Sequence, residues 1–412
     1  MQRIRARWLI FSAAPHRMFF WMGSLYAVVA VTVWTVQQAS LHTALLDPIF
    51  WEIPYPQAHA FMMIYGLFGF YFFGFLLTTF PRWLDEQPIS RRIYLSAWVC
   101  LSVGSHAFWI GLFWHVGLSI AGGLLMMLGY GIATASCTAM LVRATTPGRG
   151  RQAGICLGLA LGIVGMAAAL TAIATGEPAG YRVAKWLGIY GFLLMVILPV
   201  IYRMVPFFTS TVTPGYQLRR TEGLIPLFVA ALLLRGVLAA LDWPAFFWLG
   251  DGALFGLLVW ELVVWRAWQV RGPALLVILY VALGWFLLSF ALSAGGSLWV
   301  LLGQADVSPL RIAALHALTL GGFGTLLLGI STRVTLGHSG RGLSTTPAIN
   351  ALFYGFQLAP ISRIVPEIAE LWLPGAVVHG FWSGGLWVLI FAAWFLGVGT
   401  HLLRPRSDGR PG

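Results

Sequence analysis

Two histidines bracket the segment of the chain that carries the most chemical information. It runs from Leu315 to Arg341 and reads LHALTLGGFGTLLLGISTRVTLGHSGR. If it forms one helix, His316 and His338 lie about 33 Å apart, close to the thickness of a bilayer's hydrocarbon core. An imidazole in or near lipid is costly without a partner, and a metal ion is one of the few good partners. The segment therefore points to metal chemistry within a membrane.

The composition is that of an integral membrane protein. The 412 residues are 59% hydrophobic and 9% charged, whereas soluble domains carry about 25% charged residues. The net charge of +12 rests on arginines in short connections between apolar runs, which favours the positive-inside rule over nucleic-acid binding. The three cysteines form no CxxC or CxxCH motif. They indicate no disulfide framework, zinc knuckle or covalently attached c-type haem.

Apolar runs of spanning length predict an all-α fold of about twelve transmembrane helices in one polytopic domain, residues 1–412. They lie roughly at 18–38, 59–80, 93–114, 117–142, 154–175, 185–206, 222–241, 246–268, 274–298, 310–332, 347–369 and 376–401. The chain begins like a signal peptide, but Pro15 interrupts its apolar region, so we expect a cytoplasmic lead-in to the first span.

The charges of the connections orient the spans. Twenty of the 25 lysines and arginines fall on one side of this layout, and only Arg182, Lys185 and Arg311 fall on the other. By the positive-inside rule both termini are cytoplasmic. We therefore expect a multi-pass membrane protein.

With this orientation the histidines sort by depth. Four helices carry one at similar depth in the outer leaflet: His59, His106, His316 and His379. The cytoplasmic edge holds His16, His338 and His401. Intramembrane ionisable residues often mark functional sites, and histidine is a common ligand for haem, copper and zinc. The alternative for each is an interfacial imidazole hydrogen-bonded to a carbonyl group.

The neighbours of two outer histidines favour haem. Phe323 and Gly324 lie on the helix face of His316, and Gly66 lies on the face of His59. A glycine at such a place lets a flat macrocycle lie close to the backbone. We therefore expect both glycines to contact the cofactor.

Two arginines within predicted spans support this expectation. Arg235 and Arg363 both lie in the outer halves of their helices. An unpaired arginine in lipid is expensive, and haem propionates would be suitable bidentate acceptors. Pairing with Asp242, Glu367 or a backbone carbonyl is the alternative.

Several segments also resemble a known family. The run ALHALTLGGFGTLLLGISTRVTLGHSGR at 314–341 is similar to the signature of NnrS family proteins, and YRMVPFFT at 202–209 and APHRMFF at 14–20 resemble further family blocks. The resemblance covers nearly the whole chain. It implies about twelve spans, bound haem and copper, and a role in nitric oxide metabolism or nitrosative stress. Many members carry an HxHE motif in the second span, which here reads His59-Ala60-Phe61-Met62, so copper is the less supported cofactor.

A more distant analogy concerns haem–copper oxidases, which also have twelve spans. There one b haem is held between histidines of helices two and ten, the helices that here carry His59 and His316. The oxidase copper site needs histidines in helices six and seven, where this chain has none. The analogy favours an oxidase-like bundle with one bis-histidine haem and disfavours a binuclear centre.

We therefore expect a haem protein of the bacterial inner membrane that binds, metabolises or protects against nitric oxide or a similar diatomic molecule. His59 and His316 would hold haem b, and the two arginines would face its propionates. Two groups of histidines are candidates for a second site, which could hold a second haem. They are His379 with His106, and His16 with His338 and His401. A quinone or cytochrome would donate electrons. A transporter or channel without redox activity, and an accessory protein that delivers haem or copper, remain the alternatives.

Overall fold

The chain forms a bundle of long helices. The computed structural model describes residues 2–303, 308–373 and 380–409, and these ranges contain helices and no strand. Within them, ten helical stretches are long and apolar enough to cross a membrane, which confirms the predicted all-α polytopic membrane fold. They are Pro15–His42, Tyr55–Leu84, Arg91–Trp114, Val116–Arg143, Gly150–Thr175, Pro178–Val212, Pro244–Val264, Ala274–Leu301, Ser308–His338 and Phe381–Leu403.

Two of the predicted spans, at 222–241 and 347–369, are helical but shorter. They appear as α10 (Leu224–Ala240) and as the pair α15 (Pro347–Gly355) and α16 (Leu358–Ala369). The break between α15 and α16 has a local cause, because Pro360 has no N–H to donate to the carbonyl of Phe356. The prediction of twelve complete crossings therefore stays a prediction.

Three of the stretches form the centre of the bundle, and we call them the core spans. They are Tyr55–Leu84, Pro178–Val212 and Ser308–His338, whose most apolar windows are 89%, 83% and 72% buried. The other seven range from 33% to 56%. The outer helices turn one side towards lipid, whereas the core spans are surrounded by protein. A site enclosed by protein is therefore expected between the core spans.

Each core span changes helix type along its length, from a short α-helix through a π-helical segment to a longer α-helix. The elements are α3 (Tyr55–Phe61), η1 (Met62–Leu67) and α4 (Phe68–Leu84); α8 (Pro178–Trp186), η2 (Leu187–Leu194) and α9 (Met195–Val212); α13 (Ser308–His316), η5 (Ala317–Phe323) and α14 (Gly324–His338). In η1, for example, the N–H of Phe68 donates to the carbonyl of Met63, five residues back. Such π segments are rare and are frequent at functional sites.

The remaining helices surround the core spans in a ring. Besides α10, α15 and α16 they are α2 (Pro15–His42), α5 (Arg91–Trp114), α6 (Val116–Arg143), α7 (Gly150–Thr175), α11 (Phe247–Val264), α12 (Ala274–Leu301) and α17 (Phe381–Gly397). If α10 is counted as one span and the pair α15 and α16 as another, the described chain divides into three units of four, with a core span second in each. Contacts of α6 with α7, of α11 with α12 and of α17 with α2 join the units, so the last helix closes the ring onto the first.

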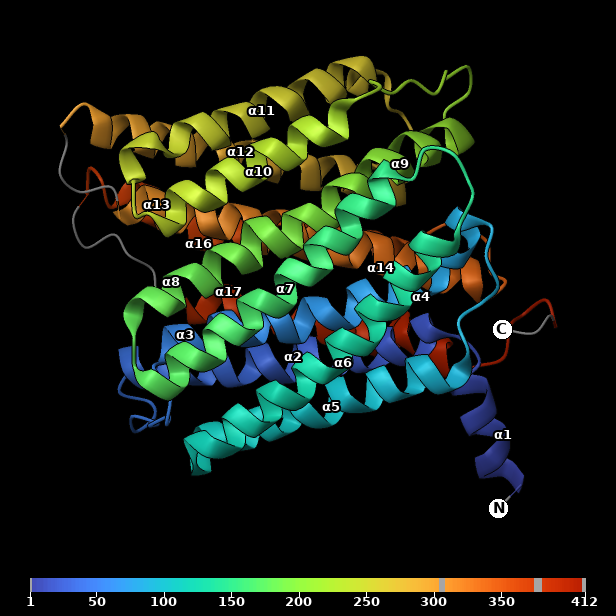
Figure 1. The fold of residues 1–412 in the computed structure, drawn as a ribbon, viewed down its shortest axis with the longest axis horizontal. Coiled ribbons are helices and arrows are strands. Elements are labelled where there is room, and N and C mark those ends of the chain that lie inside the picture. The colour runs from blue at the N-terminus through green and yellow to red at the C-terminus, as the bar shows by residue number, and fades with distance from the viewer. Residues whose placement is uncertain (1, 304–307, 374–379, 410–412) are drawn as a thin grey trace.

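The bundle has two distinct ends. The chain termini lie together at one end, which we call the terminal end, and there α1 (Gln2–Phe11) contacts η6 (Gly399–Leu403). The short helices α3, α8 and α13 lie at the other end, the opposite end (Figure 1). The prediction that the terminal end faces the cytoplasm stays a prediction.

Candidate metal centre

The two histidines predicted as haem ligands come together at the opposite end. His59 lies in α3 just before η1, and His316 is the last residue of α13 before η5. His316 is close enough to interact electrostatically with both His59 and Arg363 of α16. His59 and His316 therefore lie in the same region of the core, although they are far apart in the sequence.

Each imidazole is held in a defined orientation. The Nδ1 of His316 lies 2.9 Å from the carbonyl oxygen of Ile312, so in the neutral ring Nδ1–H donates and Nε2 keeps its lone pair. His59 stacks on Trp34 of α2, with ring centroids 4.0 Å apart and planes 18° apart. Its Nδ1 is buried without a hydrogen-bond partner among the described residues. A fixed imidazole with a free ring nitrogen is the arrangement that metal-binding histidines use.

The arginines predicted to face propionates have different surroundings. Arg363 stays beside the histidines and forms an ion pair with Glu367, one turn further along α16. Arg235 of α10 is fully buried, and its Nε lies 2.8 Å from Oδ2 of Asp251 in α11. Its guanidinium also packs over the ring of Phe247, 3.6 Å from the centroid. Both arginines therefore have carboxylate partners within the chain.

The two predicted glycines pack against aromatic side chains. A Cβ on Gly66 would lie 2.5 Å from the Oη of Tyr26. A Cβ on Gly324 would lie 2.8 Å from ring atoms of both Phe356 and Trp387. The space beside each glycine is thus filled by protein in this structure, and the small residue permits that packing.

The other outer-leaflet candidates are not brought to this site. His106 is exposed on α5, and its Nδ1 lies 2.7 Å from the carbonyl oxygen of Ser102. His379 lies outside the described residues. In the part of the chain that is described, no group of three or more His, Cys, Asp or Glu side chains is placed to hold a metal ion. Two imidazoles fit a haem iron better than a zinc or copper ion, because the porphyrin supplies four ligands of its own.

A second pair of histidines lies at the terminal end. The rings of His16 in α2 and His338 in α14 are in contact, with centroids 4.5 Å apart. His16 is buried, and its Nδ1 has no hydrogen-bond partner among the described residues. Rings this close leave no room for a haem between them. A haem here would therefore take one of the two histidines as its protein ligand.

A cavity of about 680 Å³ opens beside His338, between the ends of the three core spans. This volume is within the usual range for ligand and cofactor pockets, about 300–1,000 Å³. The walls are mainly apolar, but Arg82, Arg333 and Arg406 also line them. Of these three, only Arg406 has a carboxylate partner in the described residues, Asp408. That carboxylate raises the pKa of Arg406, so its guanidinium stays charged. The cavity suits a large ligand with an apolar body and anionic groups.

Sequence reasoning missed several residues of these sites. The partner of Arg235 is Asp251, the acidic residue near the start of the predicted span 246–268, rather than Asp242. The sequence did not indicate that Trp34 and Arg82 belong to these sites, because tryptophans and loop arginines are common in any membrane protein. Their roles depend on which helices pack together.

The fold and the histidine pairs define a class: a polytopic all-α membrane protein with imidazole pairs at both ends of a three-span core. The family model described as NnrS protein matches residues 10–406, and the chain belongs to the NnrS family. This confirms the predicted resemblance, and membership of the family suggests a haem protein of the nitric oxide response. The comparison with curated proteins finds no match.

Proposed function

We propose that this protein is a haem protein of the bacterial inner membrane that binds nitric oxide or a similar diatomic molecule. The observation that supports the proposal is that His59 and His316 lie close enough to interact electrostatically at the opposite end of the core, each with a ring nitrogen available. His59 and His316 would hold a haem b, which would supply a redox-active iron.

The surrounding residues would orient that haem. The carbonyl of Ile312 fixes the tautomer of His316, and the indole of Trp34 keeps the ring of His59 in one plane. Arg363 provides a cation for a propionate, and Glu367 holds that guanidinium in place. Arg235 is committed to Asp251, so we assign it a structural role.

A haem with two histidine ligands has no open position, so nitric oxide needs a second site. The cavity beside His338 is the best candidate, because it has the size for a macrocycle and three arginines for its carboxylates. His338 would be the single protein ligand, and the contact with His16 would orient its ring. A quinone or cytochrome would be the electron donor to the protein.

The test is the haem content and spectrum of the purified full-length protein. We expect about two haems per chain in the wild type, loss of one in His59→Ala and in His316→Ala, and loss of nitric oxide binding in His338→Ala. His106→Ala is the matched control, since His106 makes the same Nδ1 contact to a carbonyl but is exposed. It should keep the wild-type haem content.

Two outcomes would overturn the proposal. Absence of a Soret band in protein produced with ample haem would favour the alternatives, a transporter or channel, or an accessory protein for haem or copper delivery. Normal haem content in both His59→Ala and His316→Ala would refute the assignment of these ligands and leave the family membership intact.

A further inference from the structure

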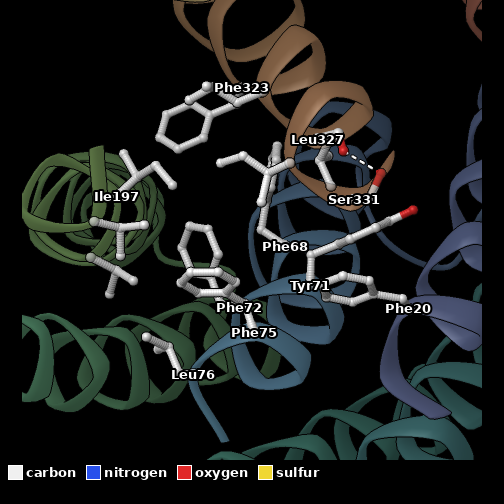
Figure 2. A pocket seen from close by; sticks show the side chains of 14 residues that line it. Phe20, Phe68, Tyr71, Phe72, Phe75, Leu76, Ile197, Phe323, Leu327 and Ser331 are labelled. Carbon is white, nitrogen blue, oxygen red and sulfur yellow. Dashed lines mark hydrogen bonds between the residues drawn. The ribbon is translucent and has the colours of Figure 1, made fainter. Parts of the chain in front are cut away.

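A small cavity lies at the centre of the core, between α4, α9 and α14. Its volume is about 40 Å³. Figure 2 shows the side chains that line it, among them Phe68, Phe72, Phe75 and Leu76 from α4, Ile197 from α9 and Leu327 from α14. A cavity needs about 10–15 Å³ to hold one water, so this one has room for a small molecule.

The polar groups on the cavity wall leave no donor for a water molecule. Ser331 donates its hydroxyl proton to the carbonyl of Leu327, as Figure 2 shows. Ser24, behind the wall, donates to the carbonyl of Phe20 at 2.6 Å, so the hydroxyl of Tyr71 donates to Ser24 at 2.8 Å. An ordered water usually needs two to four polar partners. The cavity is therefore dry and suits an uncharged, apolar occupant.

The cavity lies between the two histidine pairs. It shares Phe75, Val200 and Ile330 with the large cavity beside His338 at the terminal end. Towards the opposite end it is bounded by Phe68 and Phe323, whose ring centroids are 5.2 Å apart. Because the same side chains line both cavities, only a single layer of side chains separates the small cavity from the site where a diatomic ligand would bind.

We propose that this cavity holds a small apolar diatomic gas and lies on the path by which the gas reaches the terminal-end site. The identification of the gas as nitric oxide rests on the proposed function. The inference that the cavity holds an apolar gas is independent of the proposed function, because it is drawn from the volume and the dryness of the cavity alone.

The first experiment uses xenon, an apolar probe of similar size that needs no haem. Crystals of the full-length protein under xenon pressure should show anomalous density between Leu76, Ile197 and Leu327. Leu327→Phe should remove that density by filling the cavity, whereas the volume-conserving Leu327→Met should keep it. Absence of xenon from the wild-type cavity would refute the inference.

The second experiment measures nitric oxide association with the reduced protein after flash photolysis. Leu327→Phe should slow it by roughly tenfold, since the gas must displace a packed ring. Leu389→Phe on the exposed surface of α17 is the control and should leave the rate unchanged. If Leu327→Phe does not fold, xenon pressure on the wild type should slow the same reaction.

The outcomes separate the two proposals. Xenon density without any nitric oxide binding would refute the proposed function and support the gas cavity. If nitric oxide associates at the normal rate both with a folded Leu327→Phe variant and with the wild type under xenon, the gas does not pass through this cavity.

Discussion

Replacing Asp251 with alanine should destabilise the protein by about 3–5 kcal/mol, because it leaves a buried guanidinium without its carboxylate. The side chains of Arg235 and Asp251 are only 1% and 0% exposed. Asp251 also accepts hydrogen bonds from the hydroxyls of Tyr190 and Ser293. Each donor left unpaired adds about 1–3 kcal/mol of its own, so the expected loss is at least about 5 kcal/mol, the upper end of that range.

The matched comparison removes both charges at once. The double variant Arg235→Met with Asp251→Leu should be far more stable than Asp251→Ala, since replacing a buried ion pair with apolar residues of similar volume is often neutral. Reversible unfolding in mixed detergent, followed by tryptophan fluorescence, gives the free energies for the double-mutant cycle.

Two results would contradict this reasoning. A loss below about 1 kcal/mol for Asp251→Ala would mean that Arg235 has another partner of equal strength. Loss of haem from a stable double variant would mean that Arg235 serves a propionate, as the sequence predicted. On the proposed function, we expect the double variant to have the haem content of the wild type.

Gly322→Ala should cost about 1–3 kcal/mol, because a Cβ there would lie 2.1 Å from the ring of Phe286, whereas a Cβ on Gly284 meets nothing within 4 Å. The same unfolding assay should therefore find Gly284→Ala close to wild type, and equal stability of the two variants would contradict the packing at η5. Arg333→Gln should weaken haem retention at the terminal end by about tenfold through loss of a charge-assisted hydrogen bond, measured as haem release to apomyoglobin. Arg143→Gln is its control, since the Arg143 side chain is 64% exposed, and equal release from both variants would refute a role for the cavity arginines.

The sequence predicted the helices well because hydropathy is a local property. Even the shortened α10 and the broken pair α15 and α16 coincide with predicted runs at 222–241 and 347–369. The π segments were not predicted, because a shift in hydrogen-bond register is decided by packing rather than by composition. The sequence indicated a cofactor contact for Gly66, whereas in the structure Gly66 and Gly188 each make room for a tyrosine side chain.

The site could be predicted only in part. His59 and His316 were paired by depth and helix number, and the structure places them near each other. The partner of Arg235 was not predicted, since no spacing rule distinguishes Asp251 from Asp242 across a helix–helix turn. The cavity at the terminal end depends on Arg82, Arg333 and Arg406, which come from separate parts of the chain.

The closure of the ring has a consequence for how the protein is made. His59 belongs to the first unit and His316 to the third, and α17 must reach α2 before the ring is complete. The chain is synthesised from its N-terminus, so the first unit enters the membrane early in translation and the third unit enters late. The histidine pair at the opposite end can therefore assemble only after the third unit has entered the bilayer. A cofactor held by both histidines would therefore have to be loaded after insertion rather than during translation.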